Sequence, residues 1–284
     1  MELNEKLKLE KLATRLRVDA LTAVYSGKSG HPGGSLSVMD MLTYLYKKVM
    51  FIDANDPQNP DRDRFVLSKG HCSPALYAVL AEMGFFPREE LFGFRKTGRM
   101  LQGHPDMKGV PGVDMSTGSL GQGISAACGM AVSAKVMNKA YRVFTILGDG
   151  EIQEGQVWEA AMFAAAKKLD NLIAIVDNNG LQIDGKIEQV NSPYPITDKF
   201  TAFGWQVHTA DAHNFDSIEK TINEALSYIG KGKPIVIIQH SIKGKDVSFM
   251  EDKAEWHGNA PNEEQFTLAV KELDALYAAL EGDL

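Results

Sequence analysis

Apolar residues recur at helical spacing near the start of the chain, and further along they gather into short continuous runs. Leucines and valines among charged residues predict a helix over residues 3–27, and similar patterns predict helices over residues 214–230 and 262–281. The continuous runs have the length of buried strands, and each is followed by glycine or polar residues. The three clearest runs are residues 142–147, 171–177 and 234–240.

Weaker patterns fill the intervals between these elements. A short strand is predicted at residues 64–68, and glycines and prolines make residues 29–35, 53–63 and 95–119 loops. Strands that alternate with helices predict an α/β fold with a mainly parallel sheet, helices on both faces and right-handed crossovers. We expect a single domain over residues 1–284. The remaining predicted helices cover residues 36–49, 73–83, 121–139 and 152–169.

Composition narrows the classes of function. The formal charge is −7, and a chain this acidic is a poor candidate for non-specific binding of nucleic acid. No apolar run approaches the roughly 18 residues of a membrane span, and the charged first residues lack the apolar stretch of a signal peptide. Two cysteines fit a reducing cytoplasm. Cys128 is expected in the core, and Cys72 in the core or packed near a site.

Polar residues follow two of the predicted strands at the point where each strand ends. Asp149 lies in Gly-Asp-Gly-Glu after the strand 142–147, and Asn179 lies in Asn-Asn-Gly-Leu after the strand 171–177. The two residues are 30 positions apart with one helix between them, so both side chains reach the same edge of a parallel sheet. Two oxygen ligands there suit a hard cation such as Mg²⁺ or Ca²⁺ that bridges a diphosphate.

Local sequence around Asp149 supports the same interpretation. The adjacent glycines allow backbone N–H groups to approach phosphate oxygens, and a helix that starts near Ile152 directs its positive end to the same place. Either short motif alone is more often a plain turn, because short motifs match often by chance. The pair, at this spacing after two apolar strands, indicates a metal and diphosphate site.

Four of the seven histidines lie in loops flanked by glycine. A single loop histidine is more often a structural hydrogen-bonding group than a catalyst, but four in this setting favour a shared site. Imidazoles move protons near neutral pH and hydrogen-bond sugar hydroxyls and phosphates. The four are His31 in Gly-His-Pro-Gly-Gly, His71 in Lys-Gly-His, His104 in Gln-Gly-His-Pro and His257 in Trp-His-Gly.

At these motifs the sequence resembles transketolases. The matching stretches run through nearly the whole chain in the family's order, and as a set they are specific to that family. The resemblance implies the thiamine diphosphate-binding fold, the cofactor thiamine diphosphate, and Mg²⁺, with Ca²⁺ or Mn²⁺ as alternatives. The stretches are residues 29–35, 68–71, 102–105, 117–123, 148–155, 177–185 and 248–258.

The resemblance also assigns residues to the metal and the cofactor. It implies three metal ligands, which are the side chains of Asp149 and Asn179 and the backbone carbonyl of Leu181. Ile183 is expected to pack against the rings of the cofactor, and a plain core position is the alternative. The other implied cofactor contacts are His71, Gly118, Leu120, Gly150, Asn179 and His257.

Catalytic roles follow from the same resemblance. His31 and His257 are expected to contact the reacting oxygen of the sugar, and His104 to hold the C1 hydroxyl of the donor ketose. Glu154 is expected at a subunit interface, in a proton network between active sites; the alternative is an acid favoured by the dipole of a helix first turn. The role of Lys243 is left open: it is either a solvated loop lysine or a substrate contact.

Two positions depart from the family pattern. Ser119 stands where proline is frequent, which changes the stiffness of its loop, and Asp246 stands where glycine is frequent. We expect Asp246 to add a charge near the mouth of the site, which leaves the substrate preference open.

The resemblance covers only the diphosphate-binding half of a transketolase. After Gly258 the chain offers one helix, so a C-terminal partner subunit is expected to supply the pyrimidine-binding and C-terminal domains. We therefore expect an α2β2 heterotetramer that transfers a two-carbon ketol unit from a ketose phosphate, of the xylulose 5-phosphate type, to an aldose phosphate. The alternatives are an alpha-type subunit of another thiamine diphosphate enzyme and a non-catalytic scaffold that keeps the cofactor fold.

Overall fold

The computed structural model describes residues 1–282 and is built around a five-stranded sheet in which every neighbouring pair of strands is parallel. The order across the sheet is β1-β2-β3-β7-β6, so β7 lies between β3 and β6. This confirms the mainly parallel sheet that the apolar runs predict. The strands are β1 (Arg64–Leu67), β2 (Val143–Gly148), β3 (Leu172–Asn178), β6 (Gln206–Asp211) and β7 (Ile235–His240).

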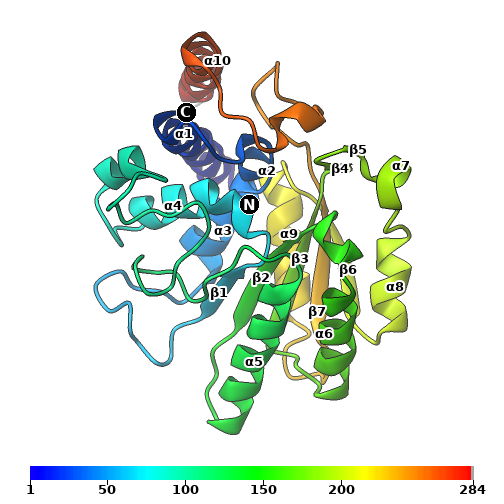
Figure 1. The fold of residues 1–284 in the computed structure, drawn as a ribbon. Coiled ribbons are helices and arrows are strands. Elements are labelled where there is room, and N and C mark those ends of the chain that lie inside the picture. Colours follow the sequence, from blue (N-terminus) through cyan, green and yellow to red (C-terminus); the bar gives the residue numbers. More distant parts are fainter. Residues whose placement is uncertain (283–284) are drawn as a thin grey trace.

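Helices cover both faces of the sheet (Figure 1). Side chains alternate between the faces along each strand, so Ile146 packs into one apolar cluster and Leu147 into the other. The first cluster includes side chains of α1, α3, α4 and α9, and the second includes side chains of α5, α6 and α8. These helices are α1 (Leu3–Gly27), α3 (Met39–Tyr44), α4 (Ser73–Glu82), α5 (Gln122–Val136), α6 (Gly155–Ala166), α8 (Ile196–Ala202) and α9 (Phe215–Leu226).

The first and last helices pack against each other. Helix α10 (Glu263–Gly282) lies beside α1 at the top of Figure 1. Phe266 of α10 stacks on Tyr25 of α1 with ring centroids 4.3 Å apart, and Leu273 and Leu21 share a small apolar cluster. The structure confirms the predicted final helix.

The segment after α1 differs from the prediction. The expected loop over residues 29–35 ends early because Pro32 starts α2 (Pro32–Ser37), where its fixed φ and missing N–H suit the first turn. The expected helix over residues 36–49 is divided between α2, α3 and a π-helical turn, η1 (Leu45–Val49). The functional consequence is that the glycines after His31 lie in a short helix instead of a loop.

Other short elements also depart from the predicted pattern. Helix α6 begins at Gly155 and not near Ile152, because a 3-10 turn precedes it. The pattern does not predict β6, since this edge strand is only partly buried and carries no continuous apolar run. Residues 95–119 form no helix or strand, as predicted. The remaining elements are η2 (Gly70–Cys72), η3 (Arg88–Gly93), η4 (Glu151–Gln153), β4 (Leu181–Gln182), β5 (Gly185–Lys186), α7 (Ile187–Asn191) and η5 (Ala254–His257).

Candidate active site

The ends of four neighbouring strands meet at one edge of the sheet and carry most of the predicted site residues. His71 follows β1, Asp149 follows β2, Asn179 follows β3, and Lys243 follows β7. These residues surround a cleft of about 280 Å³. The predicted residues that line it are His71, Leu120, Asp149, Gly150, Glu154, Asn179, Leu181, Ile183 and His257.

The three predicted metal ligands lie together in this cleft. The Asp149 carboxylate is buried and accepts hydrogen bonds from the backbone N–H of Gly150 at 2.9 Å and of Gly180 at 2.6 Å. Asn179 Oδ1 accepts from the N–H of Leu181 at 3.1 Å in the same turn. Burial raises the pKa of Asp149 to about 6, a shift that a bound cation would oppose. The donor set of carboxylate, amide and carbonyl oxygens fits a hard divalent cation.

A buried lysine adds positive charge to the cleft. Lys243 is 2% exposed, and its Nζ donates to the carbonyl oxygen of Leu181 at 3.3 Å and lies 3.0 Å from Nδ1 of His257. Burial lowers the pKa of Lys243 to about 8. Within residues 1–282 it forms no ion pair with a carboxylate, so an anionic ligand such as a diphosphate fits beside it. The interpretation of Lys243 as a solvated loop lysine is therefore wrong.

A second buried lysine, outside the predicted site residues, supports the cleft. Lys69 and Asp177 form an ion pair with 2.5 Å between Nζ and Oδ2, and their side chains are 1% and 0% exposed. Asp177 also accepts hydrogen bonds from Ser37 at 2.7 Å and from Ser241 at 2.5 Å. The pair ties the end of β1 to the end of β3, which carry a predicted cofactor contact and a predicted metal ligand.

Glu151 is another buried charge that the sequence pattern does not reveal. Its Oε1 accepts from the N–H of Gly121 at 3.0 Å, and its Oε2 accepts from the N–H of Gly148 at 3.0 Å. Burial raises the pKa of Glu151. These contacts hold the loop that carries Gly118 and Leu120 against the end of β2, so Glu151 shapes one wall of the cleft.

The four predicted histidines gather in one cluster, of which His71 and His257 line the cleft. The ring centroid of His31 lies 5.1 Å from that of His71, 5.5 Å from that of His257 and 6.3 Å from that of His104. Burial lowers the pKa of His31 to about 4 and of His257 to about 3, and it also lowers the pKa of the other two. All four imidazoles are therefore neutral at pH 7 and offer one donor and one acceptor nitrogen each.

The remaining predicted residues are less buried. His104 lies in a hollow next to the cleft, and Gly118, which has φ +147°, packs against its ring. Ile183 is 65% exposed and Leu120 is 37% exposed, so a core position for Ile183 is wrong and both offer apolar surface to a ligand. Glu154 is exposed at the N-cap position of α6 and also lines the cleft, which is compatible with either of its expected roles.

Two further expectations concern single side chains. The Asp246 carboxylate turns inward and lies 3.3 Å from Arg17 and 2.9 Å from Lys245. The expectation that Asp246 adds a charge at the mouth of the site is therefore wrong. Both cysteines are buried, which confirms a core position for Cys128. Cys72 belongs to the apolar core and also packs next to Gly34, a residue that lines the cleft, so both parts of its expected position hold.

The sequence matches one family along most of its length. Residues 9–275 match the family described as "Transketolase, thiamine diphosphate binding domain". The chain belongs to the transketolase family. It is 46% identical over 270 residues to 6-deoxy-6-sulfo-D-fructose transketolase subunit SqwG of Clostridium sp. (strain MSTE9), and the match covers 95% of this chain and 98% of that one. It is 42% identical over 279 residues to one subunit of the apulose-4-phosphate transketolase of Phocaeicola vulgatus, and that match covers 98% of each chain.

Solved transketolases share the fold. The structure of transketolase from Leishmania mexicana matches with a TM-score of 0.83 and 29% identity, over 96% of this chain and 46% of that chain. The present chain is therefore a transketolase-type, thiamine diphosphate-binding N-terminal domain, about half as long as that transketolase. Among residues 1–282, no helix has the length and apolar character needed to cross a membrane.

Proposed function

We propose that this chain is the diphosphate-binding subunit of a two-chain transketolase, and that its cleft holds thiamine diphosphate with Mg²⁺, for which Ca²⁺ or Mn²⁺ can substitute. The metal ligands are Asp149, Asn179 and the carbonyl oxygen of Leu181. The observation that carries the proposal is that these three residues line one cleft together with Lys243, a buried cation without a carboxylate partner in the described part of the chain. A diphosphate supplies the missing negative charge.

The rest of the cofactor is held by residues around this centre. The neutral imidazoles of His71 and His257 offer N–H donors to the diphosphate, and such donors bind charged acceptors strongly. The exposed side chains of Leu120 and Ile183 offer apolar surface to the cofactor rings. The further contacts are the backbones of Gly118 and Gly150.

Thiamine diphosphate supplies, when bound, the carbanion chemistry that cleaves the bond next to a ketose carbonyl. The residues of this chain bind the sugar and move protons. Burial lowers the pKa values of His31 and His257, so both rings are neutral at pH 7. His31 can exchange a proton with the reacting hydroxyl, whereas Nδ1 of His257 accepts from Lys243, so His257 acts through the hydrogen on Nε2. His104 lies beside them and holds the C1 hydroxyl of the donor, and Glu154 joins the proton network at the subunit interface.

The reaction that we propose is transfer of a two-carbon ketol unit from a ketose phosphate to an aldose phosphate. Xylulose 5-phosphate is the donor type that we expect. Two relatives are named for 6-deoxy-6-sulfo-D-fructose and for apulose 4-phosphate, so these sugars are alternative donors to test for this chain.

Exposed apolar side chains on α5 and α6 support the proposal that a partner chain binds here. Met162 and Phe163 on α6 are 60% and 42% exposed, and Val136 and Met137 at the end of the neighbouring α5 are 74% and 60% exposed. Large apolar side chains gathered on a surface mark interaction sites. We propose an α2β2 heterotetramer in which the partner supplies the pyrimidine-binding and C-terminal domains.

A coupled assay of ketol transfer tests this proposal. The chain is assayed alone and with its co-purifying partner, with thiamine diphosphate, Mg²⁺ and ribose 5-phosphate, and with each of the three donors. Activity only in the presence of the partner is the expected result, and activity of the chain alone contradicts a shared site. His104→Ala should lower the activity at least about tenfold; unchanged activity would remove the role of His104 in holding the donor.

A further inference from the structure

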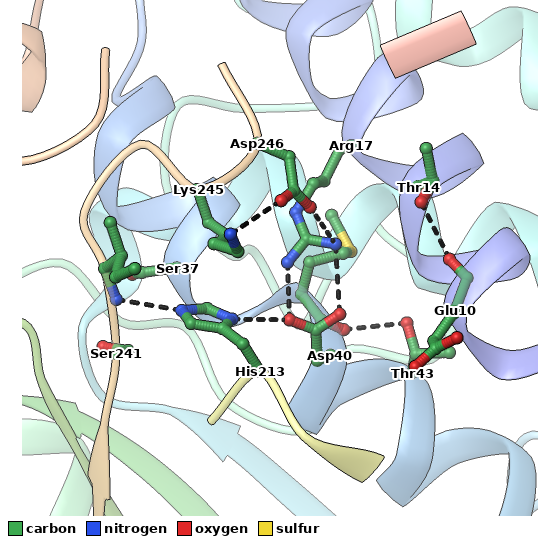
Figure 2. Close-up of polar contacts among 12 residues, drawn as sticks. Glu10, Thr14, Arg17, Ser37, Asp40, Thr43, His213, Ser241, Lys245 and Asp246 are labelled. Carbon is green, nitrogen blue, oxygen red and sulfur yellow. Dashed lines mark hydrogen bonds and ion pairs between the residues drawn. The ribbon is translucent and has the colours of Figure 1, made fainter. Parts of the chain in front are cut away.

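A ring of polar contacts, closed through the backbone of residues 242–246, joins the loop after β7 to α1 and α3 (Figure 2). Arg17 on α1 donates to both carboxylate oxygens of Asp40 on α3, at 3.0 and 2.5 Å. Asp40 Oδ2 also lies 2.7 Å from Nδ1 of His213 in the loop after β6, and Nε2 of His213 lies 2.9 Å from the backbone nitrogen of Ile242. Asp246, in the loop after β7, lies 3.3 Å from Arg17 and closes the ring.

These contacts determine the tautomer of His213. A backbone N–H can only donate, so Nε2 of His213 is the acceptor for Ile242. Nδ1 therefore carries the hydrogen and donates it to Asp40. Arg17 orients the Asp40 carboxylate with two parallel hydrogen bonds. Each member of the ring is thus held in one orientation by the next member.

The ring is shielded from water. The side chains of Arg17, Asp40, His213 and Asp246 are 2%, 8%, 12% and 15% exposed. Polar contacts in such surroundings are stronger than those on the surface, and breaking one leaves a buried group without its partner. We therefore expect the ring to hold its loops firmly.

The loop after β7 also carries Lys243. The backbone before Lys243 is held through Ile242, and the backbone after it is held by the hydrogen bond from the N–H of Gly244 to the carbonyl of Gly33 at 2.9 Å. Further along, Asp246 has φ +69°, a conformation that residues other than glycine rarely adopt. The ion pair of Asp246 with the ring offsets the cost of that conformation.

We propose that Asp40 and His213 are positioning residues for the cofactor, because they fix through Ile242 the loop that directs Lys243 to the diphosphate. Neither side chain lines the cleft itself. Ordering a long side chain and its loop on binding costs conformational entropy, and a loop that is already fixed avoids part of that cost. This inference rests on the proposed function, and it predicts that loss of the hydrogen bond from the Ile242 N–H weakens cofactor binding without changing turnover at saturating cofactor.

Two substitutions of His213 separate its contact with Ile242 from its contact with Asp40. His213→Gln places an amide oxygen near the position of Nε2 and keeps an acceptor for the Ile242 N–H. His213→Asn reaches only the position of Nδ1, so it keeps the contact with Asp40 and loses the contact with Ile242. The measurements are the affinity for thiamine diphosphate with Mg²⁺, on protein isolated with any chain that co-purifies, and deuterium exchange at the Ile242 amide.

We expect His213→Asn to weaken the affinity about tenfold and to speed exchange at the Ile242 amide about tenfold, as expected for the loss of one buried hydrogen bond. His213→Gln should stay within about threefold of wild type in both measurements. Thermal unfolding of each variant is the control for a general loss of stability.

The outcomes distinguish this inference from the proposed function. Equal affinity in His213→Asn and wild type overturns the inference, and so does a loss in both variants that only follows their stability. Failure of the wild type to bind thiamine diphosphate overturns the proposed function and the inference with it. If His213→Asn does not fold, Asp246→Ala removes the contact with Arg17 at the other end of the ring and should weaken the affinity about tenfold. An affinity within about threefold of wild type then overturns the inference.

Discussion

Replacing Lys69 with methionine should lower the free energy of unfolding by about 3 kcal/mol at pH 7. The substitution leaves the fully buried Asp177 carboxylate without the cation that lies 2.5 Å away. Removal of one partner from a buried ion pair costs about 3–5 kcal/mol. The lower end applies here because Ser37, Ser241 and Gln239 still donate hydrogen bonds to Asp177.

Urea denaturation measures this loss as a shift of the midpoint at unchanged slope. The matched control is Lys139→Met, because the Lys139 and Asp61 side chains pair on the surface, where they are 31% and 57% exposed. That control should change the free energy of unfolding by less than about 0.5 kcal/mol. The double variant Lys69→Met/Asp177→Asn should recover part of the loss, because no buried charge remains.

Acid titration of stability provides a second measurement on the same pair. Burial alone would raise the pKa of Asp177, but Lys69 holds it at about 2, below its usual value of 3.8. The pair therefore contributes stability above about pH 4 that is lost as the pH falls toward 2. In Lys69→Met burial raises the pKa of Asp177 above its usual value, so the difference between the two proteins should begin to shrink above pH 4 and continue to shrink toward pH 2. A loss below about 1 kcal/mol at pH 7, or a double variant no more stable than the single one, would refute the reasoning.

Three further predictions concern other parts of the site. Glu151→Gln keeps the shape but leaves one buried N–H without an acceptor, so thermal unfolding should show a loss of about 1–3 kcal/mol; no change would mean that solvent replaces the contact. Gly121→Ala should destabilise by at least about 1 kcal/mol, because φ is +81° and the new Cβ would lie 2.9 Å from Glu154 Cβ, whereas Gly129→Ala, with open space in α5, should be neutral or stabilising. Burial lowers the pKa of His31 to about 4, so the unfolded chain binds more protons between about pH 6.5 and 4, and stability falls as the pH falls through that window. His31→Asn should remove on the order of 1–2 kcal/mol of this acid dependence in denaturation series at several pH values, after allowance for partial exposure; an identical dependence would contradict the pKa of His31.

Burial on both faces explains which strands the sequence predicts. Strands β2 and β3 and most of β7 are covered on both sides by helices, so they form continuous apolar runs that periodicity reveals. Strand β6 is an edge strand with one buried residue in six, and its sequence resembles a loop. The glycines around Pro32 indicate a loop there, although proline is also frequent in the first turn of a helix, which is where the structure has it.

Some features of the site could likewise be predicted from the sequence, and others could not. Residues that directly follow strand ends could be placed at one edge of the sheet, and the structure brings Asp149, Asn179 and Leu181 together there. Pairs of buried charges could not be predicted, because Lys69 and Asp177 are 108 positions apart and nothing local connects them. A carboxylate at the end of an apolar run does require a partner, which is the signal that could have identified this pair.

The most direct test of the central claim is a titration of thiamine diphosphate into the protein, isolated with any chain that co-purifies, with and without Mg²⁺. Wild type, Asp149→Ala and the control Asp198→Ala, an exposed acid on α8, are compared. We predict Mg²⁺-dependent binding in the wild type and in the control, and its loss in Asp149→Ala. Equal binding in Asp149→Ala, or binding that does not depend on Mg²⁺, would contradict the assignment of the cleft as the metal and diphosphate site.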